Sequence, residues 1–362
     1  MTHSIVVEEE SLRKSPDIGS LLMELRERME PGERVLFKLP NPFLQWLRSY
    51  RSPTENWVDR HDLKNLLLLS DFKVEAEGRR GLAPYIIASP GPRTPVDVSL
   101  TCSVIVPTRN EVGNIADCVA RIPEMGAGTE ILFVDGNSSD GTVQAIEAEI
   151  EANPDKNIRL IHQLAFDQDL SDHEERELQR VEKIGKMLPQ GKADAVRKGF
   201  RAATGDVLMI LDADLTVVPE DLPLFFDQLA ARRGDFINGV RLLYPQDQEA
   251  MKFVNLLGNT FFGIALSWLL GQRIKDSLCG TKVFRRRDYD AIMEIEETLG
   301  DFDPFGDFEL LYGAAQAGLK IVDLPVHYGR RTAGQPKIET YRHGWKLFRM
   351  LWYGFLLFKA RV

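Results

Sequence analysis

The sequence has few cysteines: Cys102, Cys118 and Cys279 are the only three in 362 residues. The number is odd and no two of them form a C-x-x-C motif, which excludes a disulfide framework and a cysteine-based zinc site. The six histidines are scattered, and none pairs with a cysteine at zinc-ligand spacing. We therefore predict buried thiols in a reducing compartment.

Several targeting and binding signatures are also missing. The N-terminus lacks a basic segment followed by an apolar stretch, so we expect no signal peptide and a cytoplasmic location. The stretch 185–193 reads G-x-x-x-x-x-G-K-A, one residue too long for a phosphate-binding P-loop and without its Ser or Thr. Gly126 precedes an apolar run instead of opening a helix, which excludes a dinucleotide fingerprint there.

The chain also has no excess of basic residues, and its formal net charge is −9. Such a chain repels nucleic acid at long range, so no nucleic-acid partner is expected. Hydrophobic residues make up 44% and charged residues 27%, as in ordinary globular proteins, and a sizeable core can be buried. The length suggests two domains.

The C-terminal segment 330–362 departs from this balance, with eight Lys or Arg and a single acid, Glu339. We predict a basic amphipathic helix that contacts an anionic surface; a solvated helix face is the alternative. Residues 253–271 carry no charge and are long enough to span a bilayer, although their polar residues favour an interfacial or protein-packed helix. Residues 350–358 are too short to span, which favours an interfacial helix. A buried core or dimer contact stays open for both, and the oligomeric state stays undetermined.

The order of apolar runs predicts an α/β fold. Residues 1–33 are predicted as a helical or loose arm, and 34–95 as a small α+β unit whose helix opens at Asp59 or Asp62. From Val98 onward, β-branched runs alternate with helical patterns, as in a mostly parallel sheet covered on both faces. In such sheets ligands bind at the carboxyl ends of the strands. The charged stretch 163–190 interrupts the pattern as an insertion or a lid.

Three polar clusters follow three of the predicted strands. One cluster alone would be typical of caps and turns, but three at one edge of a sheet indicate a binding site. The first contains Pro107, Thr108, Asn110 and Glu111; the second begins at Asp135; the third is Asp212-Ala213-Asp214.

The third cluster predicts a metal site. Two close carboxylates repel each other unless a cation lies between them. Mg²⁺ binds one or two carboxylates together with substrate phosphates, so Asp212 and Asp214 are candidate ligands for Mg²⁺ or Mn²⁺. Such a metal neutralises the charge that develops on a departing diphosphate. Lys192, before the strand that leads to this cluster, can contact phosphate or be a surface lysine.

These motifs resemble inverting family 2 glycosyltransferases, a family with the GT-A fold. The matching strings, in order, are SVIVPTRNE, VDGNSSDGT, GKADAVRKGF and LDADL. Further strings resemble the dolichol- or polyprenyl-phosphate sugar synthase branch: KDSLCGTKVFRR, FGDFELL and RTAGQPKI. The resemblance implies a GT-A domain over 97–329 that binds a nucleotide sugar, GDP- or UDP-linked, at the membrane face of the cytoplasm.

The resemblance also implies roles for individual residues. Asp212 and Asp214 would hold ribose, diphosphate and metal, and Lys192 would support the nucleotide. Arg331 and Lys337 would face a donor or acceptor phosphate. The base and ribose pocket would be lined by Pro107, Asn110, Glu111 and Asp135.

The chain departs from the family pattern at two positions, and its long charged segment 163–190 is extra. Gly136 replaces an acid, which leaves the base preference open, and Pro336 stands where the family usually has Ser. Residues 34–95 resemble the tail of a methyltransferase domain that is fused to such enzymes in some bacterial proteins. No Gly-rich cofactor loop precedes them, so methyl transfer is not expected.

The role expected for Asp307 depends on whether the sugar acceptor is a phosphate or a hydroxyl group. A phosphate monoester has a second pKa of about 6 and is already an anionic nucleophile, so a polyprenyl phosphate needs no general base. We predict that Asp307 contacts acceptor or metal; a helix N-cap is the alternative. Other activities stay open: transfer to a carbohydrate hydroxyl for envelope polysaccharide, which would need a base, or an inactive binding module. A nucleotidyltransferase would need glycines after the first strand, which are absent.

Overall fold

The computed structural model describes residues 4–41, 55–163, 191–244, 253–295, 306–329, 331 and 340–360, with backbone only at 253–260 and 340–346. The chain divides into two compact units. The first unit comprises Met1–Val98, Thr216–Val283 and Leu319–Arg330, and the second unit comprises Ser99–Leu215, Phe284–Gly318 and Arg331–Val362.

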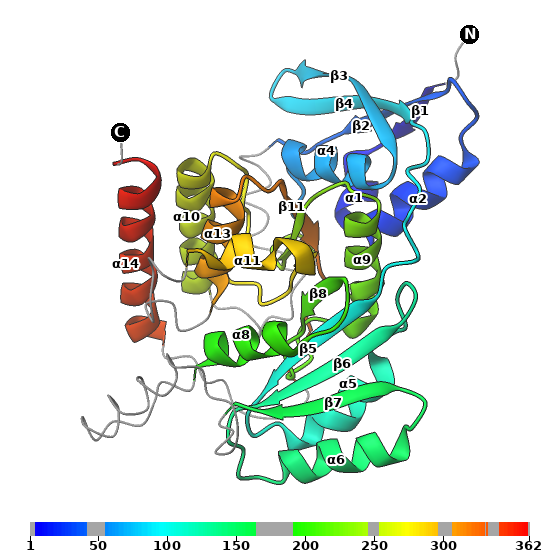
Figure 1. Ribbon diagram of the computed structural model, residues 1–362. Helices are drawn as coiled ribbons and strands as arrows, with labels where there is room; N and C mark the ends of the chain where they lie inside the picture. The colour runs from blue at the N-terminus through cyan, green and yellow to red at the C-terminus, as the bar shows by residue number, and fades with distance from the viewer. Residues whose placement is uncertain are drawn as a thin grey trace. The chain divides into compact units, whose positions relative to one another are not determined.

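The first unit opens with a four-stranded sheet in the order β1-β2-β4-β3 (Figure 1). Its strands are β1 (Ser4–Val7), β2 (Arg34–Lys38), β3 (Phe72–Arg80) and β4 (Ala83–Pro90). The pair β1–β2 is parallel, while β2–β4 and β3–β4 are antiparallel. Its helices are α1 (Glu9–Lys14), α2 (Ile18–Arg28) and α4 (Arg60–Leu69). Because β1 pairs with β2, residue 33 is not the boundary of a separate arm.

The burial pattern explains this sheet. Alternate residues of β2 point inward, so Val35 and Phe37 are fully buried while their neighbours are not. Leu12 and Leu22, on α1 and α2, join the same hydrophobic core. The predicted α4 begins as expected: Asp59 caps it by accepting from the N–H groups of His61 and Asp62, and the Asp62 carboxylate accepts from the Asp59 N–H.

The rest of the first unit contains a parallel pair of strands, β9 (Phe236–Val240) and β11 (Ile321–Pro325). Its helices are the 3-10 helix η2 (Pro219–Asp221), α9 (Leu222–Ala230) and α10 (Phe253–Leu270), and β10 (Lys282–Arg285) leads from the first unit to the second. Arg241 and the fully buried Asp276 form a two-pronged ion pair, with Nε–Oδ2 at 2.8 Å and Nη2–Oδ1 at 2.9 Å. This pair fixes the chain that follows β9 against the chain that precedes β10.

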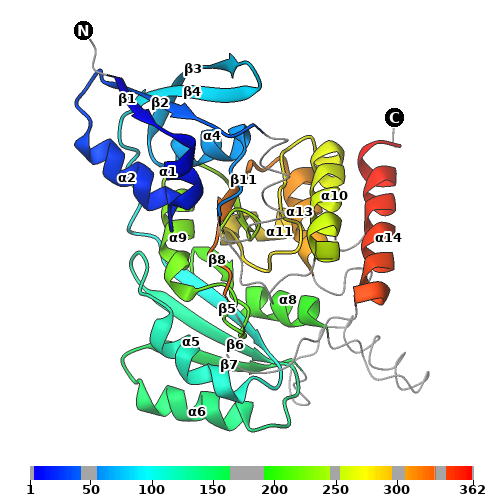
Figure 2. The same ribbon diagram turned by 180° about the vertical axis from the view of Figure 1, so that it is seen from behind.

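The second unit contains four parallel strands in the order β8-β5-β6-β7. They are β5 (Cys102–Thr108), β6 (Thr129–Asp135), β7 (Asn157–His162) and β8 (Val207–Ile210), close to the predicted runs. Figures 1 and 2 show α8 (Lys192–Ala202) on one side of these strands, with α5 (Ile115–Arg121) and α6 (Thr142–Ala152) on the other. The short helices η1 (Val112–Asn114) and η3 (Arg286–Asp288), then α11 (Tyr289–Met293), α13 (Asp307–Gln316) and α14 (Thr340–Phe358), complete the unit. The predicted α/β class with a largely parallel sheet is confirmed.

Helix α8 lies directly on the sheet because it carries a glycine at the contact. A Cβ atom at Gly199 would come within 2.5 Å of Ile105 Cγ2 on β5 and 3.1 Å of Val134 Cγ2 on β6. Any larger residue would therefore move the helix outward. The predicted burial of the thiols is confirmed, since Cys102, Cys118 and Cys279 are all free and buried.

Helix α14 is longer than the nine residues predicted as an interfacial helix, because its first turns precede Met350. Tyr312 of α13 anchors it by donating a 2.9 Å hydrogen bond to the Met350 carbonyl, and its ring meets that of Phe358. On the side of α14 that faces away from Tyr312, the apolar side chains of Phe348, Trp352 and Leu356 are exposed. Within the ranges described above, no helix is both long and apolar enough to cross a membrane.

Candidate functional site

The loops after β5 and β6 are joined by hydrogen bonds at the carboxyl end of the sheet. Asn110 Oδ1 accepts from the Ser139 N–H at 2.9 Å, and the Asn110 N–H donates to Ser138 Oγ at 2.9 Å. Asn110 adopts a left-handed conformation with φ +54°, which asparagine tolerates better than most residues. The first two predicted clusters therefore form one continuous rim.

The acidic residues of this rim are buried. Glu111 accepts from Asn114 Nδ2 at 2.8 Å, and Asp135 accepts from the Ser138 N–H at 3.2 Å. Thr108 is also buried, and its hydroxyl donates to the Val134 carbonyl. Pro107 precedes it at the end of β5 and is half-buried. These contacts hold a polar wall beside the sheet edge, and its role toward base and ribose stays a prediction.

The D-x-D cluster follows β8, as predicted, and both carboxylates have a basic partner. Lys192 Nζ lies 2.5 Å from Asp212 Oδ1, and Arg331 Nη2 lies 2.6 Å from Asp214 Oδ2. Lys192 is the first residue of α8, so this helix brings the cation to the end of the strand that follows it. The pair between Asp214 and Arg331 alone joins positions that lie 117 residues apart in the sequence.

Asp307 belongs to the same cluster. It is the first residue of α13, it is buried, and the N-cap position belongs to Gly306 instead, with φ +79°. The N-cap interpretation of Asp307 is therefore wrong. Although burial lowers the pKa of Lys192, the carboxylates of Asp212, Asp307 and Asp214 raise it well above its ordinary value. Lys192 stays charged, and it is the electrostatic centre of three acidic residues.

The donor set of this cluster fits a hard divalent cation. Asp212 and Asp214 supply carboxylate oxygens, and Mg²⁺ or Mn²⁺ prefers oxygen ligands completed by substrate phosphates. In the part of the chain that the structure describes, no group of three or more His, Cys, Asp or Glu side chains is arranged as a metal centre. A metal held by Asp212 and Asp214 would therefore share them with Lys192 and Arg331 and take its remaining ligands from the substrate.

Two further contacts beside the cluster were not predicted. Arg197 of α8 pairs at 2.9 Å with the buried Glu309 of α13, which links these two helices. Gln163, at the end of β7, donates to Asp194 at 2.6 Å and so fixes the first turn of α8. The signal in the sequence is the spacing of polar residues along α8, but their partners lie too far away in the chain to be recognised. Lys337 lies outside the described residues.

A comparison with protein-family models identifies the family. The model of glycosyl transferase family 2 matches residues 103–164 and 168–293, more than half of the chain. The chain belongs to glycosyl transferase family 2. The predicted family and GT-A type of α/β domain agree with this match and with the parallel strands of the second unit. The match does not include residues 34–95, whose likeness to a methyltransferase tail stays a prediction.

Among curated relatives, the chain is similar to two dolichol-phosphate mannosyltransferases. The Saccharomyces cerevisiae protein is 35% identical over 137 residues, which are 36% of this chain and 42% of that protein. The Pyrococcus furiosus protein is 28% identical over 267 residues, 70% of this chain and 64% of that protein. A dolichyl-phosphate hexose transferase of Haloferax volcanii is 31% identical over 43% of this chain and 64% of that protein. The matches span less than two thirds of each relative's length.

Solved structures with a similar fold include two glycosyltransferases. A mannosyltransferase from Pyrobaculum calidifontis, in complex with GDP-Man and Mn²⁺, is 18% identical with a TM-score of 0.42, covering 94% of this chain and 74% of that one. Glucosyl-3-phosphoglycerate synthase from Mycobacterium tuberculosis, in complex with Mg²⁺ and UDP, is 18% identical with a TM-score of 0.48, covering 71% and 80%.

Proposed function

We propose that the protein transfers a sugar from a nucleotide-diphosphate sugar to a polyprenyl phosphate, with inversion and with a divalent metal held by Asp212 and Asp214. The observation that supports this most is the clustering of Lys192, Asp212, Asp214, Asp307 and Arg331 in the second unit, beyond the end of β8. The names of the curated relatives, which all refer to a dolichol phosphate, support the acceptor class.

Each residue of the cluster has its own role toward the nucleotide-sugar donor. When bound, a divalent metal would neutralise the negative charge that develops on the departing diphosphate. Arg331 has a planar guanidinium suited to a phosphate oxygen pair, and Lys192 is a point charge that stays protonated beside three carboxylates. Asp135 and Glu111, on the rim, would face ribose and base. Such preorganised charges lower the barrier because they need no rearrangement as negative charge develops.

The acceptor needs little help from the protein to become a nucleophile. A polyprenyl phosphate is ionised above its second pKa of about 6, and an oxygen of that phosphate can attack the sugar directly. Asp307 then has a positioning role, because its buried carboxylate attracts Lys192 and keeps that cation in place. With a hydroxyl acceptor the same carboxylate would have to remove a proton, so its variants distinguish the two acceptor classes.

The test is an assay of GDP- and UDP-sugars with a short polyprenyl phosphate and with oligosaccharide acceptors, for wild type and D307N. With the polyprenyl phosphate we expect product, and a fall in kcat of about tenfold in D307N, about 1.4 kcal/mol, with an unchanged pH profile above pH 6. D117N, another acid in the first turn of a helix but exposed, is the control and should match wild type.

Three outcomes would contradict the proposal. Product only with oligosaccharides, with a loss of about a hundredfold or more in D307N and a changed pH profile, would show general-base catalysis on a hydroxyl. A kcat of D307N equal to that of wild type would show that Asp307 has no role in the reaction. Absence of product with every donor and acceptor, despite nucleotide binding, would favour an inactive binding module.

We also propose that α14 contacts the cytoplasmic membrane face as a peripheral anchor. Its exposed stripe of Phe348, Trp352 and Leu356 repeats every four residues and so lies on one side of the helix. The basic residues Arg349 and Lys359 accompany it, and the segment 330–362 carries a net charge of +7. Apolar insertion combined with attraction to anionic lipid is typical of an interfacial helix.

Sedimentation with anionic vesicles tests this anchor. Wild type should pellet with the vesicles at low salt and be released as salt screens the charges. The double variant F348S/W352S should bind at least about tenfold more weakly, because each large side chain contributes on the order of 1.5–3 kcal/mol when buried. The control L82S/V98S removes two apolar side chains elsewhere that are even more exposed, and it should bind like wild type. Equal binding by both double variants would contradict the assignment.

A further inference from the structure

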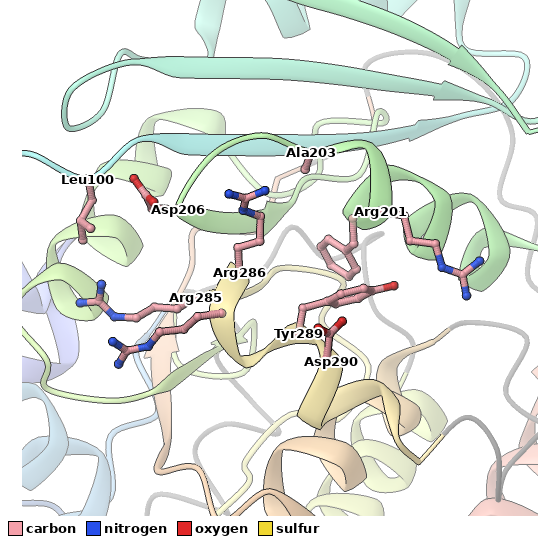
Figure 3. Close-up of a pocket in the computed structure, with 10 residues that line it drawn as sticks. Leu100, Arg201, Ala203, Asp206, Arg285, Arg286, Tyr289 and Asp290 are labelled. Atoms are coloured by element: carbon pink, nitrogen blue, oxygen red, sulfur yellow. The ribbon is translucent and has the colours of Figure 1, made fainter.

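A cavity lies in the second unit at the end of the parallel strands opposite to the D-x-D cluster (Figure 3). It encloses about 600 Å³, within the range of small-molecule sites. Its walls come from the residues before β5 and β8, from the last turn of α8, and from the segment that joins β10 to α11. The lining residues are Leu100, Phe200, Arg201, Ala203, Asp206, Arg285, Arg286, Arg287, Tyr289 and Asp290.

The lining is rich in arginine. Four arginines and two aspartates line it, so the formal charge of the lining is +2, or +1 when Asp288, 3.7 Å from Arg287, is included. Asp206 is engaged with the neighbouring strand, because its Oδ2 accepts from the Thr101 N–H at 3.0 Å and from the Thr101 hydroxyl at 2.9 Å. These bonds, followed by the charges of Arg286 and Arg285, lower the pKa of Asp206. The carboxylate therefore stays ionised and holds the strand ends together.

One of the arginines is buried although it lines the cavity. Arg285 ends β10 and is 9% exposed, whereas Arg286 and Arg287 are open to solvent. Burying a guanidinium is costly unless anions or hydrogen-bond acceptors surround it. The Arg286 N–H bonds to the Asp206 carbonyl at 2.9 Å, which fixes the turn that carries all three arginines. A guanidinium group suits phosphate oxygens because it can donate two parallel hydrogen bonds, and this turn carries three such groups.

The remaining wall is aromatic. The Tyr289 ring meets the Phe200 ring edge to face at 5.6 Å, and Phe200 in turn meets Phe284 at 5.1 Å. Figure 3 shows Tyr289 and Arg201 at one end of the cavity and Leu100, Asp206 and Arg285 at the other. The cavity thus offers an anionic group several cations and offers the rest of a small molecule a ring surface.

This cavity is remote from the D-x-D cluster. Asp206 and Asp212 stand at opposite ends of β8, about 20 Å apart at about 3.3 Å per residue. Helix α8 runs between the same two places, with Lys192 as its first residue and Arg201 in its last turn, about 14 Å along its axis. The donor-site residues therefore do not contribute to the cavity wall.

We propose that this cavity binds a small soluble compound that carries a phosphate monoester, at a site separate from the one that transfers the sugar. The phosphate lies against Arg286, Arg287 and Arg285, and the body of the compound lies against Tyr289 and Phe200. The size of the cavity limits the compound to roughly that of a sugar phosphate or a mononucleotide.

Calorimetric titration with inorganic phosphate and with glycerol 1-phosphate, at constant ionic strength, tests the site. We expect binding by wild type and a loss of affinity of at least about tenfold in R286Q/R287Q, because a hydrogen bond to a charged group contributes about 1.5–3 kcal/mol. The matched control is R79Q/R80Q, which removes another pair of adjacent exposed arginines and should bind like wild type. K192Q, altered at the sugar-transfer cluster, should also retain the binding.

Three results would overturn the proposal. Affinity that is lost in K192Q and kept in R286Q/R287Q would assign the phosphate to the sugar-transfer cluster. An equal loss in R79Q/R80Q would show attraction to surface charge alone. Binding to vesicles that contain phosphatidic acid, without binding to soluble glycerol 1-phosphate, would assign the cavity to a lipid head group. Both arginines of the main variant are exposed, so its fold is expected to persist, and an unchanged unfolding midpoint in urea verifies this.

Discussion

Replacing Asp214 with Asn is expected to lower kcat by about 10²–10³-fold while the fold persists. The substitution keeps the shape of the side chain but removes the charge that faces Arg331 at 2.6 Å and that would bind the metal. Preorganised electrostatic groups and metal ligands of this kind contribute several kcal/mol to the transition state. The Mg²⁺ or Mn²⁺ concentration that gives half-maximal rate should rise as well.

The measurement is a set of initial rates over a series of metal concentrations, for wild type, D214N and the exposed control D117N. The control should follow the wild-type curve. If D214N kept the wild-type metal dependence and lost rate only, the carboxylate would position Arg331 without binding metal. If both rate and metal dependence were those of wild type, the central proposal of a metal at the D-x-D cluster would be untenable.

The second large effect concerns stability. Replacing Asp276 with Asn should lower the free energy of unfolding by about 3–5 kcal/mol, the usual result of breaking a buried ion pair on one side. Asp276 is fully buried, and besides Arg241 it accepts from the backbone N–H groups of Arg241 and Leu278, each at 3.0 Å. Asparagine would remove the negative charge that faces the guanidinium of Arg241, whose side chain is 13% exposed.

Urea unfolding of wild type and D276N measures this, provided that the slope with denaturant stays the same. The control E10Q removes one partner of the exposed pair between Glu10 and Lys14 and should leave the midpoint unchanged. A midpoint for D276N equal to that of the control would show that the pair between Arg241 and Asp276 contributes no stability.

The same pair predicts a dependence on pH. Burial raises the pKa of Asp276, but the Arg241 guanidinium and the backbone hydrogen bonds together lower it by more. The pKa in the folded protein therefore lies below its ordinary value. The stabilisation is therefore present above the unfolded pKa of about 3.9 and is lost as the pH falls through the folded value. The difference between wild type and D276N should accordingly be constant at neutral pH and shrink in strong acid.

Several parts of the fold could be predicted because they depend on local sequence. The strands β5, β6 and β8 are continuous apolar runs, which a parallel sheet covered on both faces requires. Asp212 and Asp214 follow β8 directly, so their place at the carboxyl edge follows from the strand itself. The capping of α4 by Asp59 is equally local, since donor and acceptor lie within three residues.

Other parts depend on partners that are distant in sequence. Nothing in the residues around Arg331 indicates Asp214, and nothing around Arg197 indicates Glu309, because more than a hundred residues separate each pair. Strand β1 has only four residues and lies between polar stretches, so its pairing with β2 has no periodic signal. Arg285 and Arg286 end one motif string and Arg287 follows it directly, and only the fold places the three arginines at a cavity.

Gly199 makes the two ends of α8 depend on one small contact. A Cβ atom at this position would meet Ile105 on β5 and Val134 on β6, so a larger residue could be accommodated only if α8 moved away from the strands. Such a movement would shift Lys192 relative to Asp212, although neither of these residues had been replaced. A substitution at Gly199 is therefore expected to disturb the charged cluster beyond β8 and the cavity beside the last turn of α8 together.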